Sequence, residues 1–250
     1  MQSPSDIKDI TRPAKHICDA LAAIGTATAA SELSFMGIRD PHIRGPRPLR
    51  EGYAVAAPAL TLQCMPKRED IYGAGEYEYP ELQLHRHVLY PAQAGDMVVV
   101  DARADMASGI FGEMMLTFLA GRGGAGIVVD GCIRDSAKAR TLDLGLWVRG
   151  VTPNYHAQTN IIPFAVNVPV ACGNVLVMPG DIIIADDDGV VAVPVAMAED
   201  LIERCRHHVE WEEFSRLRLS EGGDLRKYYP LSEDAEGEYR AWKAEQDNTD

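Results

Sequence analysis

Residues Val98–Asp135 of this chain read VVVDARADMASGIFGEMMLTFLAGRGGAGIVVDGCIRD. Two apolar runs in this region, Met97–Val100 and Gly126–Val129, have the length of short strands, and each is followed by an acidic loop. Between them, residues 111–124 (FGEMMLTFLAGRGG) have the pattern of a helix that starts at a glycine and ends on glycines. The alternation of strand and helix predicts an α/β fold.

The segment after the second apolar run gathers charged side chains beside the start of the predicted helix. Asp130-Gly131 is followed by Arg134-Asp135, which adds one cation and a further carboxylate. Helix starts present free backbone N–H groups and a partial positive charge, so they suit carboxylate or phosphate ligands. A carboxylate at that point can hold a hard metal ion through oxygen. The stretch therefore predicts a metal-assisted site for a small anionic substrate.

The bulk composition is that of an ordinary globular protein. The chain has 250 residues, of which 46% are hydrophobic and 24% charged, and its formal net charge is −13 at pH 7. The apolar runs are only strand-length, so no membrane span is predicted, and the negative charge argues against nonspecific nucleic-acid binding. The five cysteines form no CxxC pair and fit reduced thiols, and the first residues lack a signal-peptide pattern, so a cytoplasmic location is expected.

The residues before the quoted stretch alternate between helical and strand patterns. Helical patterning covers Pro13–Gly25 and Thr28–Met36, with glycines as stops. Tyr53–Cys64 alternates as a strand does, and Glu81–Tyr90 is expected to form a short helix. Between these two elements, Met65–Pro80 is an unusually long polar insertion, and loops of that length tend to be functional or mobile.

The residues after the quoted stretch predict further strands and a long helix. Phe164–Pro194 is rich in strand-forming residues and is punctuated by turn pairs such as Asp188-Gly189. Met197–Leu219 has the pattern of a long amphipathic helix. We therefore expect a single α/β domain with a mixed sheet over residues 1–219, and a polar tail over residues 220–250 that is draped over a neighbour or disordered.

Two interpretations of the charged residues remain open at this point. Arg134 could pair with a substrate carboxylate through two parallel hydrogen bonds while Asp135 holds a divalent metal. A plainer interpretation makes Asp135 a helix N-cap beside a surface arginine. Glu113 at the helix start could likewise do no more than complement the helix dipole, although the amides of residues 113–115 could also hold an anion.

Four other motifs favour structural interpretations. Residues 121–126 (GRGGAG) leave a helix and enter a strand, which is the wrong order for a dinucleotide loop, so a tight connection is expected. In His85-Arg86-His87 the two histidines would not share a helix face, so surface or interface histidines are expected. Asp186–Gly189 lacks the spacing of a calcium loop and predicts a hairpin turn. Cys132 has no clear histidine partner and is expected to serve packing.

Two runs of the chain resemble one known family. These are GIVVDGCIRD (126–135) and VPVACGNVLVMPGDIIIADDDGVVAVP (168–194). They resemble the RraA-like family, which is shared by 4-hydroxy-4-methyl-2-oxoglutarate aldolase and the regulator of ribonuclease activity A, and the similarity covers residues 28–218. In the aldolase branch an acid or glycine precedes Arg-Asp by a gap of twenty, as Glu113 precedes Arg134-Asp135 here. The resemblance implies a compact swivelling β/β/α fold that assembles as trimers or hexamers, with a site between neighbouring subunits.

The resemblance also implies roles for the residues at the start of the predicted helix. Arg134 would bind the carboxylate of a pyruvate unit. The helix start at Gly112, with the amides of Met114 and Met115, would hold the same carboxylate. Glu113 stands where the family has an acid that positions a proton-carrying water.

The implied metal site centres on one carboxylate. Asp135 would anchor Mg²⁺, or Mn²⁺, mostly through water, and a glutamate from a neighbouring subunit's C-terminal part would enter the metal shell, with Glu212 or Glu213 as the counterpart here. The chain departs from the family pattern three residues after Asp135, where Lys138 replaces an acid. An ammonium at that place would favour an extra carboxylate or phosphate of the substrate.

The implied activity is that of a class II, metal-dependent aldolase. Such an enzyme cleaves a 4-hydroxy-2-keto acid to pyruvate while a divalent cation stabilises the enolate charge, and it needs no lysine Schiff base. A base takes the proton of the distal hydroxyl and an acid protonates the carbon, and the same site should decarboxylate oxaloacetate. The alternative is a non-catalytic protein that docks on a ribonuclease, with which the acidic charge is compatible. The expected partners are thus a small 2-keto acid and further copies of the chain, or a ribonuclease under the alternative.

Overall fold

The computed structural model describes residues 1–70, 72, 78–155 and 160–247. The chain divides by its contacts into two compact units, residues 1–199 and residues 200–250. The helices of the first unit are α1 (Lys15–Ile24), α2 (Thr26–Phe35), α3 (Leu84–His87), α4 (Glu113–Gly121) and α5 (Ser136–Ala139), with short 3₁₀ turns η1 (Pro4–Asp6), η2 (Pro80–Leu82) and η4 (Val195–Met197). A long helix, α6 (Ala198–Ser220), runs into the second unit, which also holds α7 (Leu225–Tyr228) and α8 (Glu233–Asp247).

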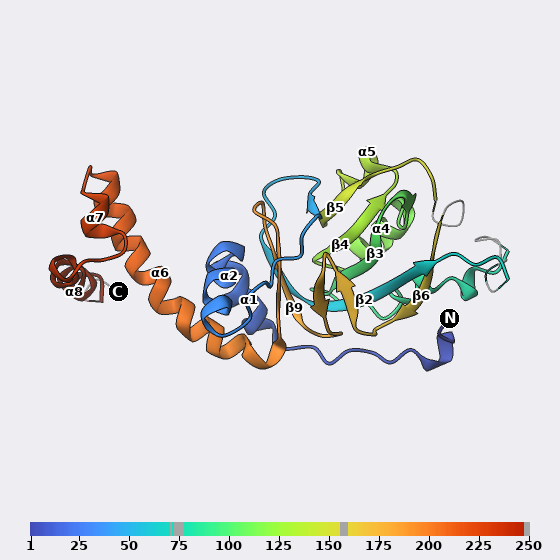
Figure 1. Ribbon diagram of the computed structural model, residues 1–250, viewed down its shortest axis with the longest axis horizontal. Helices are drawn as coiled ribbons and strands as arrows, with labels where there is room; N and C mark the ends of the chain where they lie inside the picture. The colour runs from blue at the N-terminus through green and yellow to red at the C-terminus, as the bar shows by residue number, and fades with distance from the viewer. Residues whose placement is uncertain (71, 73–77, 156–159, 248–250) are drawn as a thin grey trace. The chain divides into compact units, whose positions relative to one another are not determined.

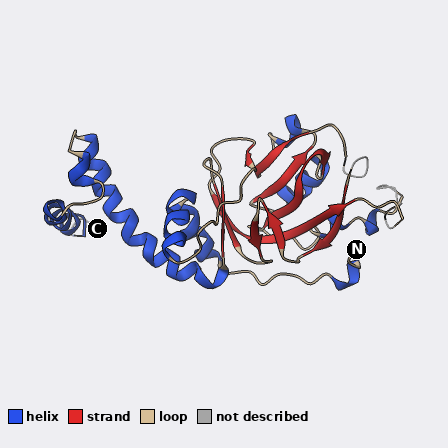
Figure 2. Ribbon diagram, in the orientation of Figure 1, coloured by secondary structure: helices blue, strands red, loops and turns tan. Residues whose placement is uncertain are grey.

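The first unit is built on a mixed sheet that curls into a nearly closed barrel (Figure 2). Its strands are β1 (Arg47–Pro48), β2 (Val55–Pro66), β3 (Met97–Gly109), β4 (Gly126–Ile133), β5 (Gly145–Val151), β6 (Ile161–Val166), β9 (Ile182–Ala185) and β10 (Val190–Val193). Their order is β1-β5-β4-β3-β2-β9-β10, and β6 also pairs with β2. Strands β2 to β5 run parallel and the remaining pairs are antiparallel, which confirms the predicted mixed α/β architecture.

The long strand β2 bends the sheet because it pairs with three different strands along its length. Residues 55–58 pair with β9, residues 59–63 pair with β3, and residues 62–66 pair with β6. The register with β6 shifts between Gln63 and Cys64. A strand shared in this way turns the sheet on itself and removes free edges.

The central strands are buried on both faces, which explains their continuous apolar sequence. Val98 and Val100 of β3 belong to one buried cluster, whereas Met97 and Val99 belong to another. The period of two along a strand sends alternate side chains to opposite faces of the sheet. Helix α4, which lies beside β3 and β4 in Figure 1, adds residues such as Leu116 to the first cluster.

The N-terminal helices are separated by Gly25, as predicted. Gly25 has a φ of +79° and ends α1, and α2 begins at the next residue, Thr26, rather than at residue 28. The carboxylate of Asp186 accepts hydrogen bonds from the Thr26 amide (2.8 Å) and hydroxyl (2.6 Å). These two hydrogen bonds cap the start of α2, whose own N-cap residue is a glycine without a side chain.

Two predicted turns are present, although the turn expected at Asn174-Val175 lies one residue earlier. Strands β7 (Val170–Cys172) and β8 (Val175–Val177) form a separate hairpin whose turn residues, Gly173 and Asn174, both have positive φ. That combination belongs to the tight turns that match strand twist. The acidic run 186–189 connects β9 and β10 as a hairpin, with the Asp186 amide bonded to the Gly189 carbonyl at 3.0 Å.

The second unit has a small aromatic core of its own. Phe214, from α6, packs against Tyr228 of α7 and against Tyr239 and Trp242 of α8. The segment after residue 219, expected to be a polar tail, is therefore largely helical, because its aromatic residues have an apolar partner in α6. No described helix is both long and apolar enough to cross a membrane. Part of the predicted insertion, residue 71 and residues 73–77, lies outside the described residues.

Candidate active site at the start of α4

The backbone brings the start of α4 next to the end of β4. The Ile110 amide donates to the Cys132 carbonyl at 3.0 Å, and the Arg134 amide donates to the Phe111 carbonyl at 2.9 Å. These two bonds continue the pairing of β3 with β4 beyond their last shared register position. As a result Gly112, the N-cap of α4, lies beside the two charged residues that follow β4.

Gly112 leaves room for those two side chains. A Cβ atom at this position would lie 2.6 Å from Asp135 Oδ2 and 2.9 Å from Arg134 Nε. Gly109 is equally restricted, since its Cβ would lie 2.6 Å from the Asn154 carbonyl oxygen. The need for glycine at 112 comes from this close approach and not from backbone strain, because the residue has an extended conformation.

Asp135 bonds to α4 rather than to the short helix that follows it. Its Oδ2 accepts a hydrogen bond from the Glu113 amide at 3.2 Å and lies 3.9 Å from Arg134 Nε. It occupies the N-cap position of α5 but makes no side-chain cap bond there. Its φ of +58° is a left-handed conformation that aspartate tolerates. The plainer interpretation is therefore right about the N-cap position of Asp135, but its side chain bonds to the start of α4 and not to α5.

Glu113 and Lys138 form an ion pair across the same region. Lys138 Nζ lies 2.6 Å from Glu113 Oε2, and this hydrogen bond raises the pKa of Lys138. The Lys138 side chain is exposed, whereas that of Glu113 is half-buried. Lys138, which stands where the resemblance implies an acid, does not line the pocket described below but contacts Glu113, which does.

These residues share one pocket of about 340 Å³. The site residues predicted in the first unit line it: Gly112, Glu113, Met114, Met115, Arg134 and Asp135. The other lining residues are Arg86, Leu89, Tyr90, Gly109, Ile110, Phe118 and Tyr155. The volume lies in the range of small-molecule sites, which begins at roughly 300 Å³.

The segment around α3 supplies one side of the pocket, which the sequence did not indicate. Arg86 and Tyr90 come from this segment, and their side chains are hydrogen-bonded to each other. The expectation of surface histidines is wrong for His85, which is fully buried with its ring 6.2 Å from that of Phe111. The sequence did not connect Arg86 with the site, because it lies 48 positions before Arg134 and the His85-Arg86-His87 motif was considered only for its histidines.

The other three carboxylates of the quoted stretch, Asp101, Asp105 and Asp130, do not line the pocket. Asp130 pairs with Arg149 and accepts a hydrogen bond from the Gly173 amide at 3.0 Å. Burial raises the pKa of Asp101, whose carboxylate accepts a hydrogen bond from the Arg103 amide at 3.0 Å. Asp105 accepts hydrogen bonds from the Ala107 and Ser108 amides. The predicted gathering of several carboxylates is thus reduced to Glu113 and Asp135, because the other three aspartates bond to the backbone instead.

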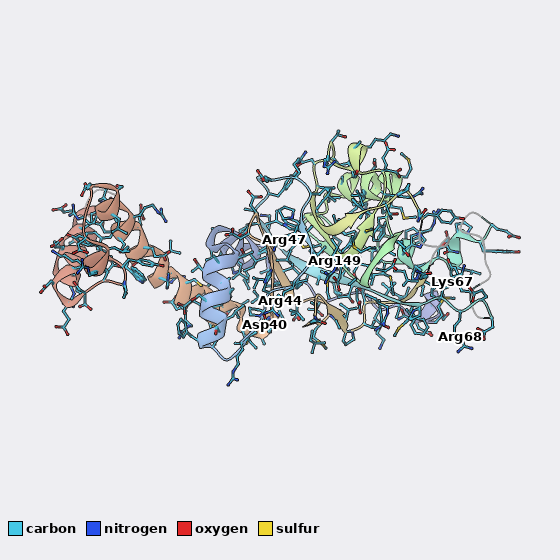
Figure 3. The ribbon with its side chains drawn as sticks, turned by 45° about the horizontal axis from the view of Figure 1, so that its top comes forward. Asp40, Arg44, Arg47, Lys67, Arg68 and Arg149 are labelled. Carbon is cyan, nitrogen blue, oxygen red and sulfur yellow. The ribbon has the colours of Figure 1, made fainter. Side chains whose placement is uncertain are left out.

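A second group of charged side chains lies around β1 and β5. Figure 3 shows Arg149 close to Arg44, and the Arg149 guanidinium donates to the Arg44 carbonyl at 3.0 Å. Arg44 itself pairs with Asp40 at 2.9 Å. These arginines have partners within the chain, so they are weaker candidates for a ligand site than the pocket.

The pocket suits a hydrated hard cation only in part. Among the described residues, no group of three His, Cys, Asp or Glu side chains is placed to hold a metal. Mg²⁺, however, keeps several waters and is often bound by one or two carboxylates together with the substrate. Asp135 offers such a carboxylate, 43% exposed and on the pocket wall. The donor chemistry therefore fits Mg²⁺ or Mn²⁺ held by Asp135, water and substrate oxygens.

The two glutamates proposed to come from a neighbouring copy lie on α6 in the second unit. Glu212 contacts His208 at 3.1 Å and accepts from the Tyr229 hydroxyl at 3.3 Å. Glu213 is exposed. Among the described residues, the Glu213 carboxylate therefore has fewer contacts within its own unit than the Glu212 carboxylate has.

The comparisons with known proteins agree with this fold. The model of the RraA-like family, described as Aldolase/RraA, matches residues 14–192, and the chain belongs to that family. A protein of Halalkalibacterium halodurans named "Putative 4-hydroxy-4-methyl-2-oxoglutarate aldolase" is 33% identical over 160 residues, which are 64% of this chain and 69% of that protein.

Solved structures support the same assignment. RraAS2 of Streptomyces coelicolor, titled "an unusual member of the RNase ES inhibitor RraA protein family", has a TM-score of 0.76 and 41% identity, over 83% of this chain and 99% of that one. An uncharacterised protein of Pseudomonas syringae has a TM-score of 0.73 at 23% identity, over 87% of this chain and 98% of that one, and shows the fold alone. The resemblance inferred from the sequence is confirmed.

Proposed function

We propose that this chain is a divalent-cation-dependent lyase that cleaves a 4-hydroxy-2-keto acid and releases pyruvate. One observation carries the proposal: the Arg134 guanidinium, the first turn of α4 and the Asp135 carboxylate line the same pocket. A guanidinium and a helix start recognise a carboxylate, and the remaining carboxylate recognises a cation. A 2-keto acid is a small molecule that needs both.

Arg134 and α4 would hold the carboxylate of the keto acid. The amides of Met114 and Met115 belong to the first turn of α4, where backbone N–H groups have no intrahelical acceptor. The helix dipole adds a partial positive charge at the same place. Asp135 already accepts from the Glu113 amide, so the carboxylate would bind one or two residues further along the helix.

Asp135 would hold the cation beside the keto oxygen. When bound, a divalent cation would act as a Lewis acid on that oxygen and offset the negative charge that develops there. The hydrogen bond from the Glu113 amide fixes one oxygen of Asp135 and thereby its orientation.

Glu113 would serve the proton transfers. As the bond between C3 and C4 breaks, the 4-hydroxyl proton leaves and C4 becomes a carbonyl, while C3 must gain a proton to give the methyl group of pyruvate. The ion pair with Lys138 holds the Glu113 carboxylate at the pocket wall. In that place it would orient a water that takes up the proton of the 4-hydroxyl group and delivers a proton to C3.

The mouth of the pocket supports a site shared between copies of the chain. Tyr90, Met114 and Phe118 line the pocket, yet these large apolar side chains are 42%, 69% and 42% exposed. Apolar groups that gather around a pocket mark surfaces that a partner covers. We propose that a second copy covers them in a closed trimer or hexamer, and that Glu212 or Glu213 of that copy approaches Asp135.

Pyruvate release tests the proposed activity. Purified protein with Mg²⁺ is mixed with a panel of 4-hydroxy-2-keto acids, and pyruvate is measured through a coupled reductase. We expect pyruvate from at least one of these acids, and we expect decarboxylation of oxaloacetate in the same site. Absence of pyruvate from every acid of the panel would contradict the proposal.

A second candidate function is a binding protein that regulates a ribonuclease. The observation that favours it is the 41% identity to a structure whose title places it in a ribonuclease-inhibitor family. Inhibition of a ribonuclease by the purified chain, together with no pyruvate release, would select this function. Pyruvate release without any inhibition would exclude it.

A further inference from the structure

We infer that Arg86 selects substrates with a second carboxylate, which it binds on the side of the pocket formed by the α3 segment. The inference rests on the proposed function, because it names the class of keto acid that the same pocket takes. It assigns the residue a role in specificity rather than in the bond-breaking steps.

Arg86 is held in place by its neighbours along the chain. Leu84 and Val88 on either side of it are buried in the main core, and His85 packs against Phe111, the residue before Gly112. The α3 segment is therefore fixed to the strand-to-helix connection that carries the rest of the site. An arginine anchored in this way presents its guanidinium without a large loss of backbone freedom.

The Arg86 guanidinium has spare hydrogen-bonding capacity inside the pocket. It bonds to the Tyr90 hydroxyl, which also donates to Glu81 at 3.2 Å. Its Nε atom is fully buried and has no acceptor among the described residues. Because Nε has no accessible surface, a carboxylate in the pocket would bind the terminal nitrogens of the guanidinium through charge-assisted hydrogen bonds.

The charges of the pocket favour a dianion. Its described lining holds two cations, Arg86 and Arg134, and two carboxylates, Glu113 and Asp135. Lys138 neutralises Glu113, and the proposed cation would more than neutralise Asp135. One substrate carboxylate would then pair with Arg134 and leave Arg86 without an anionic partner in the described lining, whereas a second carboxylate would give each arginine one.

The pocket walls suit a short chain between the two carboxylates. One side is formed by α4 and the residues after β4, where the keto acid end would bind. The other side is formed by Arg86, Leu89 and Tyr90. A leucine side chain and a tyrosine ring can cover the carbon atoms of a substrate that ends at the guanidinium.

Two matched pairs of compounds test the inference. The first pair, 4-hydroxy-2-oxoglutarate and 4-hydroxy-2-oxopentanoate, differs only by a carboxylate in place of a methyl group and reports kcat/KM. The second pair, 2-oxoglutarate and 2-oxopentanoate, lacks the hydroxyl and reports binding by calorimetry in the presence of Mg²⁺. We expect the wild-type chain to prefer the dianion in both pairs.

The variant Arg86→Gln should remove that preference. We expect its KM and Kd for the dianions to rise by about 10- to 100-fold, the effect of one lost charged hydrogen-bonding group, with the monoanion values unchanged. Arg86→Lys keeps the charge without the planar geometry and should recover only part of the loss. Arg39→Gln removes an exposed arginine and serves as the control for net charge.

The outcomes separate this inference from the proposed function. An equal loss for dianion and monoanion, or no loss for either, in a folded Arg86→Gln variant would overturn the role of Arg86. A wild-type chain that binds both anions equally would overturn it as well. If no acid is turned over, the proposed function fails, and the calorimetric pair alone then decides whether Arg86 binds a second carboxylate.

Discussion

At the scale of single residues, Arg134 is the group whose chemistry is hardest to replace. Arg134→Lys keeps the positive charge but loses the two parallel donors that fix a carboxylate. We expect the binding of pyruvate or oxalate to weaken by about 1.5–3 kcal/mol, the usual contribution of a hydrogen bond to a charged group. Calorimetry with oxalate measures this change. Oxalate binding that is unchanged in Arg134→Ala would remove Arg134 from the site.

Lys138 provides a second test, because its substitution changes the charge beside the pocket but none of the residues that line it. Lys138→Glu replaces the ion pair at 2.6 Å with two adjacent carboxylates. We expect Mg²⁺ to bind more tightly and anionic substrates to bind more weakly, each by several-fold. The control is Lys8→Glu, the same charge change at an exposed position outside the pocket lining. Identical Mg²⁺ affinities in the two variants would show that Lys138 does not act on the site.

The residues of the candidate site were predictable where topology brings them together. Glu113, Arg134 and Asp135 follow neighbouring parallel strands, whose carboxyl ends meet at one edge of a sheet. Arg86 was not predictable, because only the tertiary packing of His85 on Phe111 places it there. Asp130 was expected near the site but does not line the pocket. It pairs with Arg149 of the neighbouring strand, and the sequence pattern does not show which residues of two strands lie opposite each other.

At the scale of elements, Asp96 ties the first residues of the chain to the sheet. It lies just before β3, is almost fully buried, and accepts hydrogen bonds from Arg12 at 2.8 and 2.9 Å and from the Gln93 amide at 2.8 Å. Asp96→Ala removes these hydrogen bonds and leaves Arg12 with Asp9 and the Pro91 carbonyl as partners. We expect the free energy of unfolding to fall by about 2–3 kcal/mol, because hydrogen bonds to a charged group are lost. Urea denaturation measures the change.

The matched control for that variant is Asp19→Ala. Asp19 also pairs with a cation, Lys15, but both side chains are exposed on α1. Exposed pairs of this kind contribute about 0.3–0.5 kcal/mol. Equal losses in the two variants would contradict the anchoring role of Asp96.

Most elements of the first unit were predictable because their patterns are regular, and the exceptions have local causes. β3 continues to Gly109 although its second half reads as an acidic loop. Its pairing with β4 is interrupted twice, and Arg103 and Ala104 take left-handed conformations at one interruption. The alternation of polar and apolar residues along a strand does not show where the pairing of such irregular strands is interrupted.

At the scale of the whole molecule, the exposed rim of the pocket predicts an assembly. We expect light scattering at micromolar concentration to give the mass of a trimer or hexamer. Replacing Met114 and Phe118 by serine should weaken the assembly, because both are exposed apolar side chains at the pocket mouth. A monomer at that concentration would rule out a site shared between copies.

The second unit could not be foreseen from the polar composition of its sequence. Residues 220–250 carry many charges, and the segment has a core because five of its side chains cluster with Phe214: Tyr228, Leu231, Ala235, Tyr239 and Trp242. A few well-spaced aromatic residues are enough to order two short helices against a third. The high charge content of the segment gives no indication of such a small aromatic cluster.

The central claim is that Asp135 supports metal-assisted release of pyruvate from the pocket at α4. The most direct test compares wild-type chain and Asp135→Asn in the coupled pyruvate assay, with Mg²⁺ and with excess EDTA. Asparagine keeps an oxygen to accept the Glu113 amide and tolerates the left-handed conformation, so the thermal midpoint should change little. We expect pyruvate release by the wild-type chain only with Mg²⁺, and none by the variant. Full activity of Asp135→Asn, or of the wild-type chain in EDTA, would contradict the claim.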